Sequence, residues 1–447
     1  MNCIWITTDS FRQDHVHAYR PEGPWDPTGV SFIVKTPNLD RLAKEAVVFD
    51  RMRAESLPTI PCRRAFFTGR RIFPWADEPY VKGLYNRHPG WRPLGQSDIT
   101  LAEQLREQGF VTAMVTDTYH LFKPSMNFHR GFQGFHWVRG QEYDAWRTHP
   151  LPEGYLQGFL KEGVALPEER TRVLVQFLQN HQGLERENDM PTARTFRWAI
   201  QWLQANCDHK RFFLYIDTFS PHEPWMPPAR FLDLYESNWE GPRLVYGNPY
   251  QRDQLSLREH HHLRARYAAC CTMVDHWVGR LLDALDELSC KDDTLVVLVS
   301  DHGKIVGEFG HYGMPAEDLG PALADVPCMV RHPSGLHEGE RFQGLLYNID
   351  LTATVLGLLG VDPIPGMQGQ DVWPALEQES QTFRQHLLTA YGRMVAVWDE
   401  EWLLLSNEKT GERRLYNILE DPGRGKDLFD QYSHLAEALA LREAHPL

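Results

Sequence analysis

Short apolar runs that end in polar residues constrain the fold of this chain more than any other feature of its sequence. The runs cover residues 2–7, 111–117, 211–219, 294–300 and 326–333. Segments with apolar residues at helical spacing lie between them, at 36–49, 99–109, 168–206, 263–288 and 348–360. Strands that alternate with helices predict a mostly parallel sheet with helices on both faces. We therefore expect an α/β fold of three layers.

The pattern changes after about residue 375. Residues 387–419 contain strand-like runs that are separated by turn residues near Asp399-Glu400 and Gly411, and a helical segment follows at 432–443. Consecutive strands joined by tight turns indicate an antiparallel sheet. We therefore predict two domains: a large α/β domain at 1–375 and a small antiparallel α+β subdomain at 376–447.

Charge and cysteine usage restrict the partners that we expect. The net charge of −14 is opposite in sign to the charge that a nucleic-acid polymer attracts. No run reaches the roughly 18 apolar residues of a membrane-spanning helix, and MNCIWITTDS lacks the features of a secretory leader. The seven cysteines have no regular spacing. These features predict a cytoplasmic protein without membrane or nucleic-acid partners, and they are compatible with a homo-oligomer.

Polar residues at the ends of the apolar runs are candidates for a metal site. Asp9, Asp217 and the pair Asp301-His302 each lie at or just beyond the end of such a run. The carboxyl ends of parallel strands converge on one crevice, and carboxylate and imidazole groups bind divalent metals. Each residue alone could equally be a helix cap or part of a turn, but together they favour a site.

Residues 56–70 carry the most specific pattern in the chain, SLPTIPCRRAFFTGR. It resembles the sulfatase signature, in which Cys or Ser, any residue, Pro, any residue and Arg precede Thr-Gly-Arg. Thr59, Pro61 and Arg63 occupy the first, third and fifth places of that signature, and Thr68-Gly69-Arg70 follows at the family offset. The resemblance implies the sulfatase family of the alkaline phosphatase superfamily, with its alkaline-phosphatase-like sandwich fold.

The resemblance extends along nearly the whole chain. It includes the Asp9 of the first predicted strand and the closing stretch at 415–423, which looks like the "LYDL…DPGE" stretch of the family. The segments between them that match family motifs are Tyr119-His120-Leu121, Pro221-His222-Glu223-Pro224-Trp225 and Ser300-Asp301-His302-Gly303.

Thr59 is the departure from the family pattern with the largest chemical consequence. Sulfatases oxidise the Cys or Ser at this place to formylglycine, and Thr59 cannot form that aldehyde. A covalent adduct would therefore form on an ordinary alcohol. Attack of water at phosphorus can release a phosphorylated or phosphonylated threonine, whereas a sulfated threonine is harder to release. The sequence thus favours a hydrolase of phosphodiesters or phosphonate monoesters.

A threonine hydroxyl needs activation, which metal coordination supplies. The resemblance assigns Asp9, Asp301, His302 and Thr59 to one divalent metal. Ser10 stands where a second Asp is usual in the family, and His302 replaces an Asn or Gln. Both changes favour Zn²⁺ or Mn²⁺, with Ca²⁺ or Mg²⁺ as alternatives.

The resemblance also implies roles for residues around this metal. Arg63 should hold Thr59 or the transferred group, and His222 and His120 should face the anion or the leaving group. Thr118 and Tyr119 are expected to contact the substrate. Thr118 and Met314 stand where the family usually has lysines, so we expect little cationic contact with the substrate. A second metal could bind at Asp217, His222 and His311; the alternative is that these residues only hydrogen-bond the substrate, and one ion is favoured over two.

Three alternatives to the phosphorus hydrolase remain at the level of sequence. The first is a sulfatase-like enzyme that acts on sulfuric esters. The second is a transferase that passes the phosphoryl group to an alcohol, and the third is a binding protein without catalytic activity. For each enzyme the expected partner is a small anionic ester.

Overall fold

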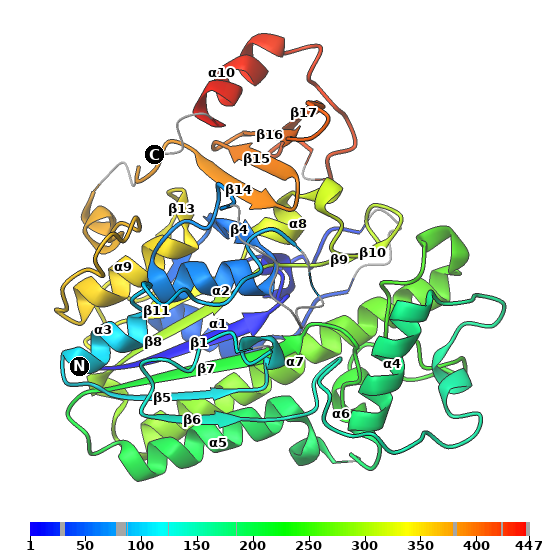
Figure 1. Cartoon of the computed structure of the whole chain (residues 1–447), viewed down its shortest axis with the longest axis horizontal. Helices are drawn as coiled ribbons and strands as arrows, with labels where there is room; N and C mark the ends of the chain where they lie inside the picture. The colour runs from blue at the N-terminus through cyan, green and yellow to red at the C-terminus, as the bar shows by residue number, and fades with distance from the viewer. Residues whose placement is uncertain are drawn as a thin grey trace.

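The computed structural model describes residues 1–26, 32–76, 86, 88–123, 125–184, 186–378, 382–421 and 423–443. An eight-stranded sheet forms its centre (Figure 1). In spatial order its strands are β12 (Arg341–Phe342), β2 (Val47–Phe49), β11 (Cys328–Arg331), β8 (Thr294–Ser300), β1 (Asn2–Asp9), β7 (Phe212–Pro221), β5 (Val111–Thr116) and β6 (Gly134–Trp137). All neighbouring pairs are parallel except the two that β11 makes with β8 and β2. The predicted mostly parallel sheet is therefore confirmed.

The central strands are buried on both faces because helices cover each side. Along β1, Cys3 and Trp5 belong to one core, and Ile4 and Ile6 belong to the other. This alternation follows from the two-residue period of a strand. On the Trp5 side lie α2 (Thr59–Thr68), α3 (Leu101–Glu107) and α9 (Asn348–Leu358); on the opposite side lie α1 (Pro37–Glu45), α5 (Pro191–Asn206) and α7 (Leu257–Glu287). The three-layer α/β architecture is as expected.

Three of the expected helices differ from the structure. Residues 36–49 are not one helix, because α1 ends at Glu45 and the β-branched Val47-Val48 pairs as β2 with β11. The segment 168–206 is divided into α4 (Glu168–His181) and α5, which begins at Pro191, a residue suited to the first helical turn. Helix α7 starts before residue 263, because Ser256 caps it and accepts a hydrogen bond from the backbone of Glu259.

The signature segment forms a strand, a turn and a helix. The short strand β4 (Ser56–Leu57) leads into α2, which begins at Thr59 and ends at Gly69 in the left-handed conformation. Glycine suits that end because its φ of 62° is strained for other residues. Helix α2 packs against α9, and this contact holds the first residue of the signature at the edge of the sheet.

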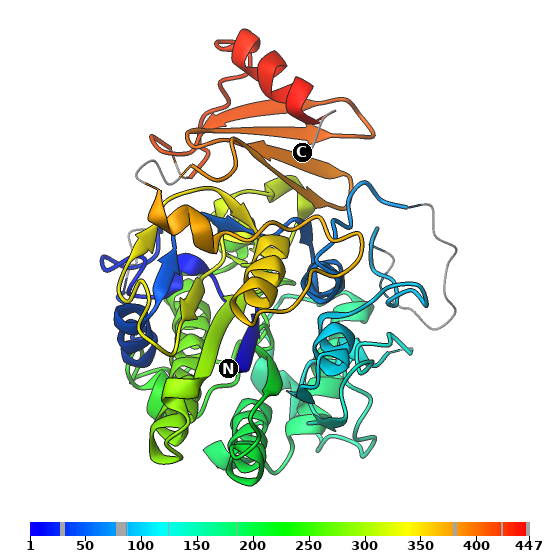
Figure 2. The same ribbon diagram turned by 90° about the vertical axis from the view of Figure 1, so that its left-hand side faces the viewer.

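A second sheet follows the first along the chain. It contains β14 (Leu387–Tyr391), β15 (Met394–Trp398), β16 (Trp402–Asn407) and β17 (Arg413–Asn417) in antiparallel order, and α10 (Ser433–Glu443) packs against it (Figure 2). The antiparallel C-terminal sheet is as expected. However, β4 adds a parallel strand to β14, so this sheet includes the strand that precedes the signature helix. The division at residues 375 and 376 stays a prediction.

The remaining short elements are β3 (Met52–Arg53), β9 (Ile305–Val306), β10 (Tyr312–Gly313), β13 (Leu346–Tyr347), α6 (Ala229–Leu232) and α8 (Pro321–Ala324). Within the part of the chain that the structure describes, every helix is too short or too polar to cross a lipid bilayer.

Candidate active site

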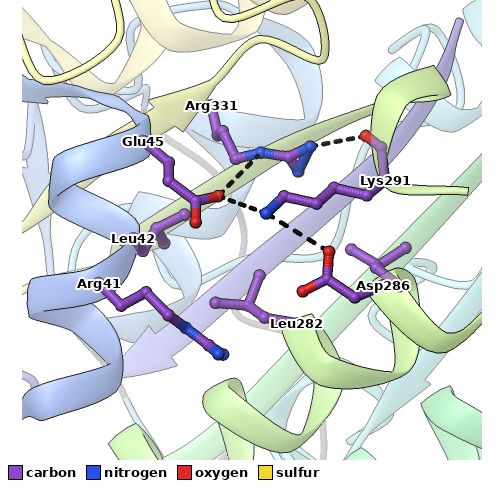
Figure 3. Close-up of a pocket in the computed structure, with 8 residues that line it drawn as sticks. Arg41, Leu42, Glu45, Leu282, Asp286, Lys291 and Arg331 are labelled. Atoms are coloured by element: carbon purple, nitrogen blue, oxygen red, sulfur yellow. Dashed lines mark hydrogen bonds and ion pairs between the residues drawn. The ribbon is translucent and has the colours of Figure 1, made fainter. Parts of the chain in front are cut away.

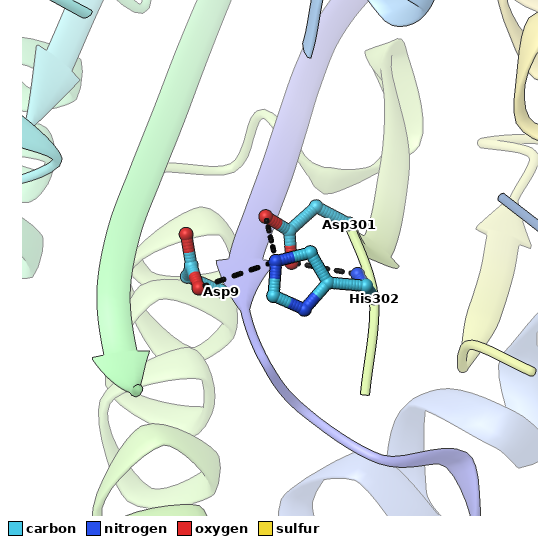
Figure 4. A group of neighbouring side chains, drawn as sticks. All are labelled: Asp9, Asp301 and His302. Carbon is cyan, nitrogen blue, oxygen red and sulfur yellow. Dashed lines mark hydrogen bonds and ion pairs between the residues drawn. The ribbon is translucent and has the colours of Figure 1, made fainter. Parts of the chain in front are cut away.

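Three of the predicted metal ligands converge where β1 and β8 end. Asp9 is the last residue of β1, and Asp301 and His302 follow β8, which pairs with β1 up to Thr8 and Ser300. One donor atom from each of the three residues lies within 4.8 Å of the others. Figure 4 shows the carboxylates and the imidazole pointing toward one another. All three side chains are fully buried.

The backbone around this site fixes the orientation of its ligands. Ser10 has a φ of 62°, and this turn lets its backbone N–H donate to Asp301 Oδ1 at 3.0 Å. The Ser10 hydroxyl donates to Asp9 Oδ1 at 2.9 Å. His302 Nδ1 lies 2.9 Å from the carbonyl oxygen of Gly303. A carbonyl oxygen can only accept, so Nδ1 carries the proton and the Nε2 lone pair faces the carboxylates, as a metal ligand requires.

Thr59 lies beside this ligand set. Its Oγ1 is 3.4 Å from His302 Nε2, and its side chain is buried at the start of α2. His302 Nε2 is also 3.3 Å from Asp301 Oδ2 and 3.9 Å from Asp9 Oδ1. The predicted group of Asp9, Thr59, Asp301 and His302 is therefore assembled around one imidazole nitrogen.

Arg63 joins three carboxylates: Asp9 at the end of β1, Asp301 just after β8, and Asp217 within β7. Its Nε and Nη2 each donate to Asp217 at 2.8 Å, and its Nη1 pairs with Asp301 and lies 3.2 Å from Asp9 Oδ2. Every nitrogen of the guanidinium faces a carboxylate, so Arg63 holds the three acidic side chains together. The geometry does not place Arg63 as a free contact for the transferred group.

The charge of the cluster suits a divalent cation. Three buried carboxylates face one guanidinium, which leaves two negative charges when all are ionised. Burial, with the nearby Asp301 carboxylate, raises the pKa of Asp9 to about 7, and burial also raises the pKa of Asp301. Among the described residues, the nearest cationic group to Asp9 Oδ2 that the ion pairs give is Arg63 Nη1 at 3.2 Å, and this oxygen accepts no hydrogen bond. Two carboxylates, an imidazole nitrogen and a hydroxyl form a donor set that divalent metals accept.

Asp217 and Thr118 contact each other inside the fold. The Thr118 hydroxyl donates to Asp217 Oδ1 at 2.6 Å, and the Tyr215 hydroxyl donates to Asp217 Oδ2 at 3.0 Å. Both oxygens of Asp217 are thus engaged with protein groups, Arg63 included. The geometry gives Thr118 a role in orienting Asp217, where the sequence had suggested contact with the substrate.

The suggested second metal site gains no support from the geometry. His311 Nε2 pairs with Asp318 on its own loop. Among the described residues, Asp9, Asp301 and His302 form the only group of three or more His, Cys, Asp or Glu side chains that is close enough to hold an ion. His260 and His262 lie in the first turns of α7 and are buried against Tyr312 and Glu236.

His222 and His120 lie near the ligand group, since the charges of His302 and Arg63 affect the pKa of His222 and the charge of Arg63 affects the pKa of His120. His222 Nδ1 donates to the carbonyl oxygen of Glu223 at 2.7 Å, which leaves Nε2 as an acceptor. Burial lowers the pKa of His222 well below its ordinary value, and the charges of Lys304 and His302 add to this effect. Burial likewise lowers the pKa of His120, whose ring packs against Trp91 at 4.9 Å between centroids.

Tyr119 packs against His120. It stacks on His120 with 4.1 Å between the ring centroids, and its hydroxyl donates to Glu142 at 2.6 Å. Burial raises the pKa of Glu142 to about 7. The contact of Tyr119 and His120 with a substrate stays a prediction.

Sequence reasoning missed Lys304 and its partner Glu223. The two side chains form an ion pair and are both nearly fully buried. Burial lowers the pKa of Lys304 to about 7. The signal was present in the sequence, because Lys304 is a charged residue two positions after the metal-site His302, in a segment that is otherwise Gly and apolar residues.

A pocket elsewhere in the molecule is not a candidate site. It lies between α1, α7 and the residues that precede β8, at the amino end of that strand (Figure 3). Asp301 and His302 follow the carboxyl end of the same strand. Lys291 pairs there with Glu45 at 2.9 Å and Asp286 at 3.4 Å. These ion pairs connect helices and leave no convergent group of catalytic side chains.

Comparison with protein families shows two matches. The sulfatase family matches residues 1–361, and the family described as the C-terminal part of N-sulphoglucosamine sulphohydrolase matches residues 321–444. Among curated proteins, the chain is 25% identical to the multifunctional alkaline phosphatase superfamily protein PehA of Trinickia caryophylli, over 84% of this chain and 77% of that protein. It is 22% identical to an arylsulfatase of Clostridium perfringens, over 94% of this chain and 88% of that protein.

Solved structures show the same fold. The phosphonate monoester hydrolase of Agrobacterium radiobacter superposes with a TM-score of 0.71 at 19% identity, covering 100% of this chain and 96% of that one. A structure solved in complex with its substrate D-glucosamine-2-N,6-O-disulfate superposes with a TM-score of 0.70 at 18% identity, covering 99% and 97%.

Proposed function

Because this chain belongs to the sulfatase family of hydrolases, we propose that it hydrolyses phosphodiesters or phosphonate monoesters with Thr59 as the nucleophile. The observation that carries this proposal is the position of Thr59. It occupies the first place of the family signature, begins α2, and directs its hydroxyl to within 3.4 Å of a ligand in a buried acidic metal site.

Enzymes of this family depend on a metal, and the residues of this chain fit one divalent ion. We propose that Asp9, Asp301, His302 and Thr59 hold it, and that the imidazole favours Zn²⁺ or Mn²⁺ over Ca²⁺ or Mg²⁺. When bound, the ion would lower the pKa of the Thr59 hydroxyl and polarise the ester. Arg63 holds the carboxylates of Asp9 and Asp301 in place from the side of α2.

The reaction proceeds in two steps at phosphorus. In the first, Thr59 Oγ1 forms a bond to phosphorus while the bond to the leaving oxygen breaks. In the second, water attacks phosphorus and the bond to Thr59 breaks. His222 accepts the Thr59 proton at Nε2 and passes it to the leaving oxygen; it then accepts a proton from water and returns it to Thr59. Its Nδ1 bond to Glu223 keeps Nε2 available.

Threonine is the reason to prefer phosphorus over sulfur. The charge of the substrate does not decide, because a phosphodiester, a phosphonate monoester and a sulfate monoester each carry one negative charge at neutral pH. The hydrolysis of the covalent adduct on Thr59 is the step that favours phosphorus over sulfur, since a threonyl ester of phosphorus is opened by attack of water at phosphorus. The phosphonate monoester hydrolase among the superposed structures supports this choice.

A sulfatase-like activity is the second candidate. The arylsulfatase among the relatives and the N-sulphoglucosamine sulphohydrolase C-terminal match favour it. Transfer of the phosphoryl group to an alcohol is a further alternative, whereas the match to a family of hydrolases argues against substrate binding without catalysis. The cytoplasmic location and the homo-oligomer rest on the sequence alone and stay predictions.

Turnover measurements with three chromogenic esters separate these functions. The purified protein is supplied with Mn²⁺ or Zn²⁺ and assayed with bis-p-nitrophenyl phosphate, p-nitrophenyl phenylphosphonate and p-nitrophenyl sulfate. We expect the two phosphorus esters to be hydrolysed faster than the sulfate. Faster turnover of the sulfate would instead establish the sulfatase-like activity, and an increase in rate when an alcohol is added, with its phosphorylated product, would indicate transfer.

A further inference from the structure

Lys304 brings a buried positive charge to the carboxyl edge of the central sheet. It lies two residues after His302, and its ammonium group pairs with Glu223, which follows His222. Lys304 and Glu223 each expose only 2% of their side-chain surface. The pair therefore connects the loop after β8 with the loop after β7, and each of these loops carries a histidine of the candidate site.

Arg12 and Glu308 hold the backbone of the loop that carries Lys304. Arg12 Nη1 donates to the carbonyl oxygen of Lys304 at 3.1 Å and also pairs with Glu308. Glu308 in turn accepts a hydrogen bond from the backbone of Val306 at 2.7 Å. The backbone of residues 304–308 is thus held on the side of Arg12, while the Lys304 side chain reaches toward Glu223 and His222.

The other cationic groups near the site are already engaged. Arg63 directs all of its nitrogens at carboxylates, and Arg170 donates to the Tyr246 hydroxyl at 3.1 Å. Thr118 and Met314 carry no charge; Thr118 donates to Asp217, and Met314 packs against the apolar core. An ammonium group has three donors, and the ion pair with Glu223 occupies one of them. Lys304 therefore has donors to offer to an anion beside His222.

We infer that Lys304 binds a non-bridging oxygen of the group that is transferred, with Glu223 as its counterion in the absence of substrate. The inference deepens the proposed function, and it rests on that function only in placing the ester at Thr59. It reverses the expectation from Thr118 and Met314 that this site makes little cationic contact with its substrate. It also predicts that Glu223 weakens binding of the substrate, because this carboxylate competes with the substrate for Lys304.

Anion binding by four variants tests the inference separately from the identity of the ester. Isothermal titration calorimetry measures inorganic phosphate and inorganic sulfate binding to the metal-loaded protein. Lys304→Met should weaken binding of the anion that the wild type prefers by about 10-fold or more, because a buried charge partner is lost. Lys304→Arg should stay within about 3-fold of the wild type, since the charge remains. Glu223→Gln should bind the anion as tightly as the wild type or more tightly.

The matched control is Lys291→Met. Lys291 also lies in an ion pair, with Glu45 at 2.9 Å, at the opposite end of β8, and its loss should leave anion binding unchanged. Equal weakening by Lys304→Met and Glu223→Gln would show that the pair only stabilises the loops, and it would overturn the inference. So would anion binding by Lys304→Met within about 2-fold of the wild type. If the wild type hydrolyses the sulfate ester, the proposed function fails, whereas this test still decides the role of Lys304.

Discussion

Arg63 and Asp217 form a bidentate ion pair in the interior of the protein, with Nε and Nη2 each 2.8 Å from a carboxylate oxygen. The pair joins the signature helix to the middle of β7, and both side chains are fully buried. It also directs the remaining nitrogen of Arg63 toward Asp9 and Asp301. Arg63, the fifth residue of the signature, thus holds the acidic side chains in place beside Thr59, the first residue of the signature.

Replacement of Arg63 should destabilise the protein most when no metal is present. Arg63→Met leaves Asp9, Asp217 and Asp301 without their positive partner, which should lower the free energy of unfolding by about 3–5 kcal/mol in chelator. Added Zn²⁺ or Mn²⁺ should recover part of that loss, as urea denaturation would show. Arg41→Met is the control, because Arg41 and Asp283 form a half-exposed pair that contributes about 1 kcal/mol or less.

Thr59→Ala should remove the nucleophile and leave the other three proposed metal ligands, Asp9, Asp301 and His302, intact. Turnover of the preferred ester is expected to fall by about 1,000-fold or more, with metal content by mass spectrometry near that of the wild type. Thr59→Ser keeps the hydroxyl and should retain more activity than Thr59→Ala. Rates for Thr59→Ala within a few-fold of the wild type would assign the nucleophile elsewhere.

His222→Ala should affect esters according to their leaving groups. If His222 delivers a proton to the leaving oxygen, phenyl esters, whose leaving groups are poor, should lose about 100-fold in turnover. The corresponding 4-nitrophenyl ester needs less protonation and should lose much less. An equal loss for the two leaving groups would indicate that His222 orients the site and does not transfer the proton.

Chelation should abolish activity and lower stability together. An ion that binds only the folded state, and is present at a concentration of 1,000 times its Kd, stabilises that state by about 4 kcal/mol. Removal of the metal with EDTA should therefore lower the melting temperature, and addition of Zn²⁺ or Mn²⁺ should restore both activity and melting temperature. In Asp301→Asn the ion should have a smaller effect on melting, because one of the proposed ligands has lost its charge. Full activity after exhaustive chelation would argue against a metal-dependent reaction.

Stability should fall in mild acid because of buried histidines, and His181 tests this outside the candidate site. Burial lowers the pKa of His181 from 6.5 to about 4, so the folded protein favours the neutral ring. The contribution of His181 is fully present above pH 6.5 and is lost as the pH falls toward 4. At pH 5 the loss amounts to about 2 kcal/mol. The unfolding free energy of His181→Phe should decline less between pH 7 and pH 5 than that of the wild type, and parallel declines would contradict this assignment.

The sequence by itself determined the layers of the fold and the edge at which the candidate metal ligands lie. The apolar runs at 2–7 and 294–300 specify buried strands. Asp9 follows the first run after one residue, and Asp301 and His302 follow the second directly. These features depend on side chains that are neighbours in the chain, so a local pattern records them. The segments 36–49 and 168–206 were assigned wrongly as single helices, because pairing of β2 with the distant β11 decides the first and the break before Pro191 decides the second.

Only the tertiary structure decided which charged groups meet. Arg63 and Asp217 are 154 positions apart in the chain, and Thr118 and Asp217 are 99 apart. No local pattern records such a partner. The energy of a buried charge depends on the groups that surround it in space, and for Lys304 that group is Glu223, on the neighbouring loop.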